Sequence, residues 1–105
     1  MSEYIRAVLI GTDGVTVDTD IPNTLSALQE AVGGYIQTVD LGGIILICNE
    51  EGLLLDLPEN YRAGRICGEL GFAIRIVGNA VFVGYDGTDG FASLSDRQAE
   101  LLERL

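Results

Sequence analysis

The sequence contains no histidine, no lysine and no tryptophan, so its six cationic side chains are all arginines. Histidine is the most common general base and metal ligand, and lysine forms the Schiff bases of covalent catalysis. Without histidine, no serine, threonine or cysteine has its usual activating base, and a zinc or iron site lacks ligands. We therefore expect a protein that is not an enzyme and that uses no metal or other cofactor.

Positive charge is also scarce, because six basic residues stand against sixteen acidic ones and the net charge is −10. Binding to the phosphates of a nucleic acid requires clustered lysine and arginine, so this balance argues against a nucleic-acid partner. A strong negative field can instead attract basic proteins. The same acidity also serves simple solubility, and the acids are scattered rather than arranged in runs.

Long hydrophobic runs are missing as well. The longest uninterrupted apolar run is Ile44–Cys48, much shorter than the ~20 residues that span a bilayer. The N-terminus opens on Met1-Ser2-Glu3 without a basic flank, unlike a secretory signal. Cys48 and Cys67 lack the CxxC spacing and lie among apolar residues, which favours two reduced core thiols over a disulfide or redox pair. We expect a cytoplasmic protein without a membrane partner.

The 105 residues are typical of a single domain, which we place at residues 1–105. Glycines divide the chain into short elements. The apolar patterns predict strands at residues 4–10, 15–18, 35–41, 44–48, 53–55, 72–77 and 80–85. Helices are predicted between residues 22–24 and Gly33-Gly34, over residues 61–70, and after Ser95. This order predicts an α+β fold: a mostly antiparallel sheet of about six to seven short strands with two to three helices packed on one face.

Three local signals refine this prediction. Gly42-Gly43 and Gly78-Asn79 each separate two apolar runs, as in β-hairpins. Ser95 and Gln98 form a capping-box pair. The strand at 44–48 is apolar on both faces, which predicts a central position in the sheet.

If all helices cover one face of the sheet, the other face is left apolar and exposed, and a homodimer is the common way to bury it.

Two acidic motifs deserve comparison with known sites. The loop Asp86-Gly87-Thr88-Asp89-Gly90 resembles a calcium loop in composition, but Phe91 and Arg97 occupy the positions where an EF-hand needs glycine and glutamate. A solvated turn is the favoured interpretation. Adjacent Glu50 and Glu51 could divide acid and base roles, yet a Glu-Glu-Gly turn favours two solvated carboxylates.

The most suggestive cluster consists of Asn60, Tyr61, Arg62 and Arg65. On a helix, Arg62 and Arg65 are i, i+3 neighbours and share one face. Two arginine forks beside an aromatic ring and an amide can hold a phosphate or carboxylate. The alternative is that both arginines only offset nearby acids such as Glu59 and Glu69. The first interpretation makes these four residues a candidate ligand-binding site.

Several segments together resemble a known family. They are Ile5-Arg6-Ala7, Thr24-Leu25-xx-Leu28-Gln29-xx-Val32-Gly33-Gly34-Tyr35-Ile36, Asn49-Glu50-Glu51-Gly52-Leu53, Leu57-Pro58-x-Asn60-x-Arg62, Ile76-Val77-Gly78-Asn79-Ala80 and Leu94-Ser95-Asp96. Over nearly the whole chain, the combination is similar to the domain of unknown function 3846. The sequence departs from the family pattern at Gln37, where an acid is common.

The resemblance implies a phage, prophage or other mobile-element setting, and it implies no activity and no catalytic residues. Two functional hypotheses follow. The first is a non-enzymatic binding protein that acts on a host component, for example by sequestering a small anionic ligand such as a signalling nucleotide through Tyr61, Arg62 and Arg65. The second is an acidic decoy that engages host DNA-binding or defence proteins. An enzyme that works with carboxylates and arginine alone is the least favoured alternative.

Overall fold

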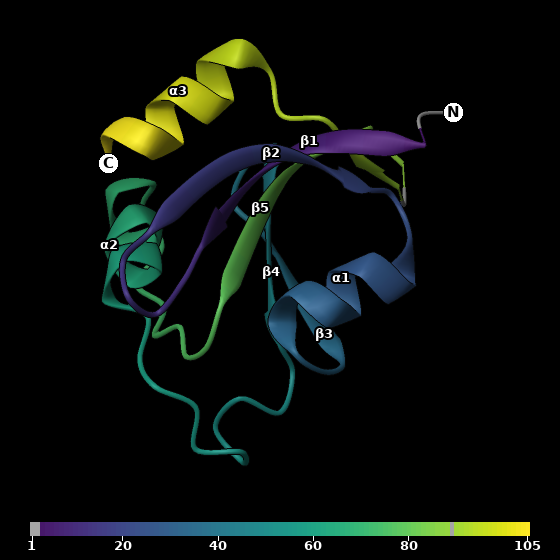
Figure 1. Ribbon diagram of the computed structural model, residues 1–105. Helices are drawn as coiled ribbons and strands as arrows, with labels where there is room; N and C mark the ends of the chain where they lie inside the picture. The colour runs from purple at the N-terminus through teal and green to yellow at the C-terminus, as the bar shows by residue number, and fades with distance from the viewer. Residues whose placement is uncertain (1–2, 89) are drawn as a thin grey trace.

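The computed structural model describes residues 3–88 and 90–105, which build one antiparallel sheet and three helices (Figure 1). The strands follow the order β2-β1-β5-β4-β3, and the short β6 pairs with β5. The strands are β1 (Tyr4–Ile10), β2 (Thr16–Pro22), β3 (Ile36–Asp40), β4 (Ile44–Asn49), β5 (Ala80–Tyr85) and β6 (Phe91–Ala92). The helices are α1 (Leu25–Val32), α2 (Tyr61–Glu69) and α3 (Asp96–Arg104). The predicted α+β class with a mostly antiparallel sheet is confirmed.

Side chains alternate between the two faces of the inner strands, as the pleat requires. On β4, Leu46 packs into a core with α2 and α3, whereas Ile45 and Ile47 pack into a second core with α1. Every residue of β4 is buried, as its apolar run predicted. The central strand is nevertheless β5, which lies between β1 and β4, so the prediction of a central β4 is wrong by one place.

The helices divide between the two faces of the sheet. Two of them, α2 and α3, share one face, as predicted, while α1 lies on the opposite side (Figure 1). The expectation that every helix would cover the same face is therefore wrong, and the fully uncovered face that motivated the homodimer does not exist. The homodimer itself stays a prediction. No helix among the described residues is long and apolar enough to cross a membrane.

Several local predictions are confirmed by backbone geometry. Gly42 and Gly43 have φ of +89° and +100°, the left-handed values that a two-residue hairpin turn between β3 and β4 needs. Ser95 and Gln98 form both hydrogen bonds of the capping box at the start of α3. The first helix begins at the N-cap Thr24 and ends at Gly33 in the left-handed conformation. Leu28 and Val32 form the buried face of this helix, whereas Leu25 in its first turn is 58% exposed.

Two predicted strands do not form. Residues 53–55 lie in a succession of turns, and residues 72–77 form no strand, with only an isolated bridge between Val77 and Glu59. The Gly78-Asn79 hairpin is therefore absent, and the short β6 was not predicted. The predicted strand at 15–18 is longer and runs from Thr16 to Pro22. Within the predicted loop at residues 86–90, Asp89 lies outside the described residues.

Candidate functional site

Three of the four predicted site residues meet at one depression of about 400 Å³. The first turn of α2 supplies Tyr61, Arg62 and Arg65, and the β1–β2 turn faces them with Thr12, Asp13 and Gly14. We call this set of six residues the arginine depression. Arg62 and Arg65 line it together, as their i, i+3 spacing predicted. Tyr61 is largely exposed at its rim.

The fourth predicted residue, Asn60, lies beneath the depression and is 1% exposed. Its Oδ1 accepts a hydrogen bond from Ala63 N (3.0 Å), which caps the N-terminus of α2. Its Nδ2 donates to the main-chain oxygens of Ile10 and Gly78, both at 2.9 Å. Because the amide is buried and already bonded on both ends, Asn60 holds α2 against the end of β1. It positions the arginines and is not itself free to contact a ligand.

Both arginines reach across to the last turn of α3. Arg62 Nη2 donates to the main-chain oxygen of Glu103 (3.1 Å), and Arg65 Nη2 donates to that of Leu105 (2.8 Å). Main-chain oxygens at a helix C-terminus lack helical partners and carry partial negative charge, so cations are stabilising there. The alternative interpretation, in which the arginines offset Glu59 and Glu69, is wrong in its partners, because Glu59 pairs with Arg75.

Neither arginine forms an ion pair with an aspartate or glutamate side chain among the described residues. Arg62 Nε is also buried without a hydrogen-bond partner. Each guanidinium has five N–H donors, and one donor on each is used by the α3 carbonyl groups. Among the described residues, two adjacent cations with spare donors and no aspartate or glutamate partner therefore border a depression in a chain of net charge −10.

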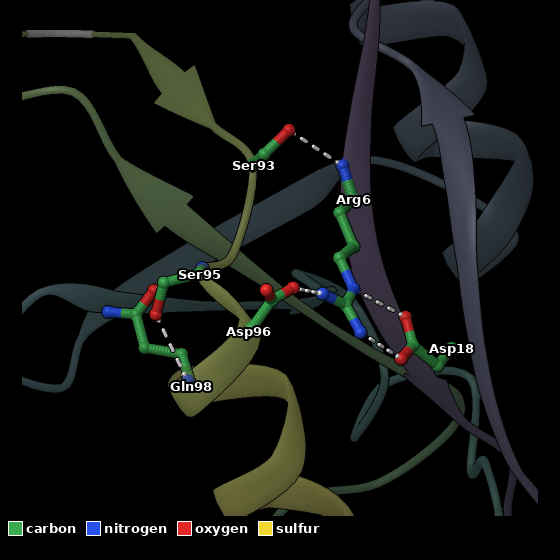
Figure 2. Close-up of polar contacts among 6 residues, drawn as sticks. All are labelled: Arg6, Asp18, Ser93, Ser95, Asp96 and Gln98. Carbon is green, nitrogen blue, oxygen red and sulfur yellow. Dashed lines mark hydrogen bonds and ion pairs between the residues drawn. The ribbon is translucent and has the colours of Figure 1, made fainter.

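Arg6 shows the opposite arrangement, and Figure 2 shows its guanidinium between two carboxylates. Its Nε and Nη2 donate to the two oxygens of Asp18 at 3.0 and 2.7 Å, and Nη1 pairs with Asp96 at the start of α3. The main-chain N–H of Arg6 donates to Ser93 Oγ (2.9 Å). The pairing lowers the pKa of Asp18. Arg6 thus ties β1 and β2 to α3, a role that sequence reasoning missed although a lone cation within an apolar strand was a visible signal.

The described residues of the two acidic motifs bring no set of metal ligands together. Among the described residues, no group of three histidine, cysteine, aspartate or glutamate side chains could hold a metal ion. Asp86 Oδ1 instead accepts hydrogen bonds from the Thr88 hydroxyl and from the main-chain N–H groups of Thr88 and Gly90, which lowers the Asp86 pKa. These hydrogen bonds are all made within the loop, so the Asp86 carboxylate is used to stabilise the turn.

The two cysteines lie in the core that faces α2 and α3, and both are free and buried. Burial raises the pKa of the Cys67 thiol to about 11, and it also raises the pKa of Cys48. Since the thiolate is the reactive form, this environment is that of inert packing thiols.

The family comparison agrees with the segments noted in the sequence. The family model "Domain of unknown function (DUF3846)" matches residues 5–105. The chain belongs to this family. The resemblance predicted from the sequence is confirmed, and the arginine depression of this DUF3846 protein lies within the matched range. No curated protein and no solved structure matches the chain.

Proposed function

We propose that this DUF3846 protein is a non-enzymatic binding protein that sequesters a small anionic ligand, such as a signalling nucleotide, in the arginine depression. One observation carries the proposal: Arg62 and Arg65, two of only six cations, line the same depression without an aspartate or glutamate partner among the described residues. Among the described residues, Arg6 and Arg75 pair with acidic side chains and Arg97 and Arg104 do not, so what sets Arg62 and Arg65 apart is that they share one depression.

The chemistry of the depression suits a phosphate or a carboxylate. Guanidinium groups present planar forks of donors that match the oxygens of these anions, and charge-assisted bonds are stronger than neutral ones. The first two residues of α2, Tyr61 and Arg62, line the depression, so the partial positive charge of this helix N-terminus lies close to it. Asn60 fixes that N-terminus through three hydrogen bonds. The cations are therefore held in place before a ligand arrives, which reduces the entropy lost on binding.

Calorimetric titration tests the proposal with pyrophosphate and a panel of nucleotides. Arg65→Gln is the informative variant, because Arg65 is exposed and its loss should leave the fold intact. We expect it to weaken binding by about tenfold, the cost of one charge-assisted pair. Arg97→Gln is the matched control, since Arg97 is also exposed, removes the same charge and lies outside the depression. Absence of binding across the panel at about 1 mM would sink the proposal.

The biological part of the proposal is a phage or other mobile-element setting with a host component as target. Its support is the setting that the sequence resemblance implies for members of the family, to which residues 5–105 of this chain are matched. Genomic neighbourhood tests this part independently of binding. Genes for anti-defence or replication functions beside this one support it, whereas a setting among unrelated housekeeping genes contradicts it.

A second candidate function is the acidic decoy, and the long loop between β4 and α2 favours it (Figure 1). Leu53, Leu54 and Leu55 are all exposed there, Leu54 by 84%. Acids flank these leucines in the sequence: Glu50, Glu51 and Asp56. An apolar patch with an acidic border fits a partner protein whose apolar cleft has a basic border.

Salt separates the two candidates. A decoy bound through an acidic border should lose its host partner as ionic strength rises, since exposed charges are screened. A ligand held in the arginine depression should be retained much better. Co-purification at low and high salt, followed by analysis of both the proteins and the small molecules that are retained, distinguishes the two.

A further inference from the structure

A second depression of about 360 Å³ adjoins the arginine depression at the β1–β2 turn. It lies on the α1 side of the sheet, and five of its eleven lining residues are apolar ones on that side or in and just before β2: Leu9, Val15, Val17, Ala31 and Val81. We call these five residues the apolar groove. Thr12 and Asp13 line both depressions, so a single turn of the chain is the wall that they share.

The apolar groove has the size and the chemistry of a small-molecule site. Sites of this kind have volumes of about 300–1,000 Å³ and are lined mainly by apolar side chains with a few polar groups. Val15 is 57% exposed and Val17 is 46% exposed, whereas Val81 is buried. A ligand that contacts these exposed valines would remove their apolar surface from water, which stabilises the complex. The favoured occupant is therefore an aromatic or aliphatic group.

Two polar side-chain oxygens, those of Asp13 and Asn79, lie in the second depression near the β1–β2 turn, and Asp13 also lines the arginine depression. Gly11 marks this place, because a methyl group there would come within 2.7 Å of Asp13 Oδ1 and 3.7 Å of Asn79 Oδ1. Both oxygens are hydrogen-bond acceptors, and Asp13 Oδ1 already accepts from Val15 N at 3.0 Å. Acceptors in an apolar site that adjoins a cationic one suit a linking group that carries hydroxyl or amino donors.

We infer that the ligand is an amphiphilic anion whose anionic group binds Arg62 and Arg65 while its ring occupies the apolar groove, with donor groups facing Asp13 and Asn79. A nucleotide has this layout of phosphate, hydroxyl-bearing sugar and planar base. The inference rests on the proposed function, because it extends the arginine depression into a two-part site. It predicts that neither the phosphate nor the base alone accounts for the affinity.

Calorimetry with three kinds of probe tests the inference: pyrophosphate, the four nucleosides and the four nucleoside diphosphates. We expect at least one diphosphate to bind about tenfold or more tightly than pyrophosphate, from burial of its ring. Val17→Asn should remove that advantage and leave the affinity for pyrophosphate unchanged. Leu54→Asn is the matched control, because it also removes an exposed apolar side chain but lies outside the groove.

The outcomes separate the inference from the proposed function. If every diphosphate binds only as well as pyrophosphate, and Val17→Asn changes nothing, the groove is not part of the site while the arginine depression stands. If a nucleoside binds as tightly as its diphosphate, and Arg65→Gln has no effect, the arginines are not used and both proposals fall as stated. If no probe binds, both are overturned together. Circular dichroism of each variant confirms that the fold is retained.

Discussion

One face of the sheet packs against α2 and α3 in a core of fifteen buried residues, whereas the opposite face packs against α1 in a core of eight (Figure 1). The first face is closed by two helices and by the extended segment at residues 72–77. The second is covered by one helix of eight residues, and the apolar groove opens beside it. We call the face with α2 and α3 the thicker layer and the face with α1 the thinner layer. The thicker layer supplies most of the hydrophobic stabilisation, and the thinner layer leaves room for a ligand.

The two faces also differ in the number of hydrogen bonds by which a buried asparagine holds their helices. Asn60 bonds three main-chain groups and joins α2 to two other segments. Asn49 bonds two, with Nδ2 donating to Val32 O at the end of α1 and Oδ1 accepting from Glu51 N. Each asparagine anchors one helix to the sheet. The helix with more anchoring bonds is the one that carries the arginines of the candidate site.

The largest expected effect compares the two cores directly. Ile44 and Ile45 are neighbours on β4, are 5% and 6% exposed, and point to opposite faces. Truncation of a buried isoleucine to alanine costs about 2–5 kcal/mol, depending on how far the surroundings collapse into the cavity. We expect Ile44→Ala to lie near the upper end and Ile45→Ala near the lower end, because α1 alone can shift more easily than α2 and α3 together.

Urea denaturation of both variants measures this difference. Their shared residue type and strand make each the control for the other. An equal loss of stability, or a greater loss for Ile45→Ala, would show that the thinner layer is packed as rigidly as the thicker one.

The next effect concerns the asparagines. Asn60→Ala leaves two buried carbonyl oxygens and the Ala63 N–H without their partner, and we expect a loss of about 3 kcal/mol in unfolding free energy. Asn49→Ala removes fewer bonds, so about 1–2 kcal/mol is expected. Chemical denaturation gives both values. A smaller loss for Asn60→Ala than for Asn49→Ala would contradict the stronger anchoring of α2.

Sequence reasoning predicted best where local chemistry decides the structure. The Gly42-Gly43 turn, the Ser95–Gln98 capping box and the α2 boundaries all depend on a few neighbouring residues. It was less successful where tertiary pairing decides. Residues 72–77 do alternate as a strand would, with Phe72, Ile74 and Ile76 packed into the core. No ladder forms because β1 and β4 already occupy both sides of β5.

The candidate site shows the same limit. Spacing along a helix predicted that Arg62 and Arg65 would share a face, and they do. Nothing local to them could predict that α3, some forty residues later, would supply their acceptors. The prediction of a strand at residues 53–55 was wrong for a related reason, because three consecutive leucines are typical of a buried segment. The tight turn there, with Asp56 at φ +53°, leaves them exposed instead.

A third prediction uses pH to probe the link between β2 and the thicker layer. Because Arg6 holds the pKa of Asp18 below its ordinary value, the stabilisation from this pair is present above that value and is lost as pH falls through the folded pKa. Between about pH 6 and pH 3, Asp18→Asn should therefore lose less stability than the unsubstituted chain. Urea denaturation at several pH values measures this difference. Asp20→Asn, on the exposed edge of the same strand, is the control and should follow the unsubstituted chain.

The smallest expected effect lies outside both layers, in the exposed leucines of the β4–α2 loop. Leu53, Leu54 and Leu55 are all exposed, so each substitution by serine should change the unfolding free energy by no more than about 0.5 kcal/mol. Urea denaturation checks this value, and Ile44→Ala provides the contrast of an apolar residue that is buried. A loss of more than about 1 kcal/mol would mean that the leucines are covered in solution.

Light scattering on the same leucine variants then tests what covers them. The predicted homodimer would give twice 11.2 kDa. If the dimer forms through this loop, substitution of all three leucines by serine returns the mass to that of one chain. Because the surrounding acids repel each other across such a contact, added salt should strengthen the dimer, whereas it should weaken the complex of an acidic decoy with a basic partner. A single-chain mass that salt does not alter would leave the loop free for a different protein and would contradict the homodimer.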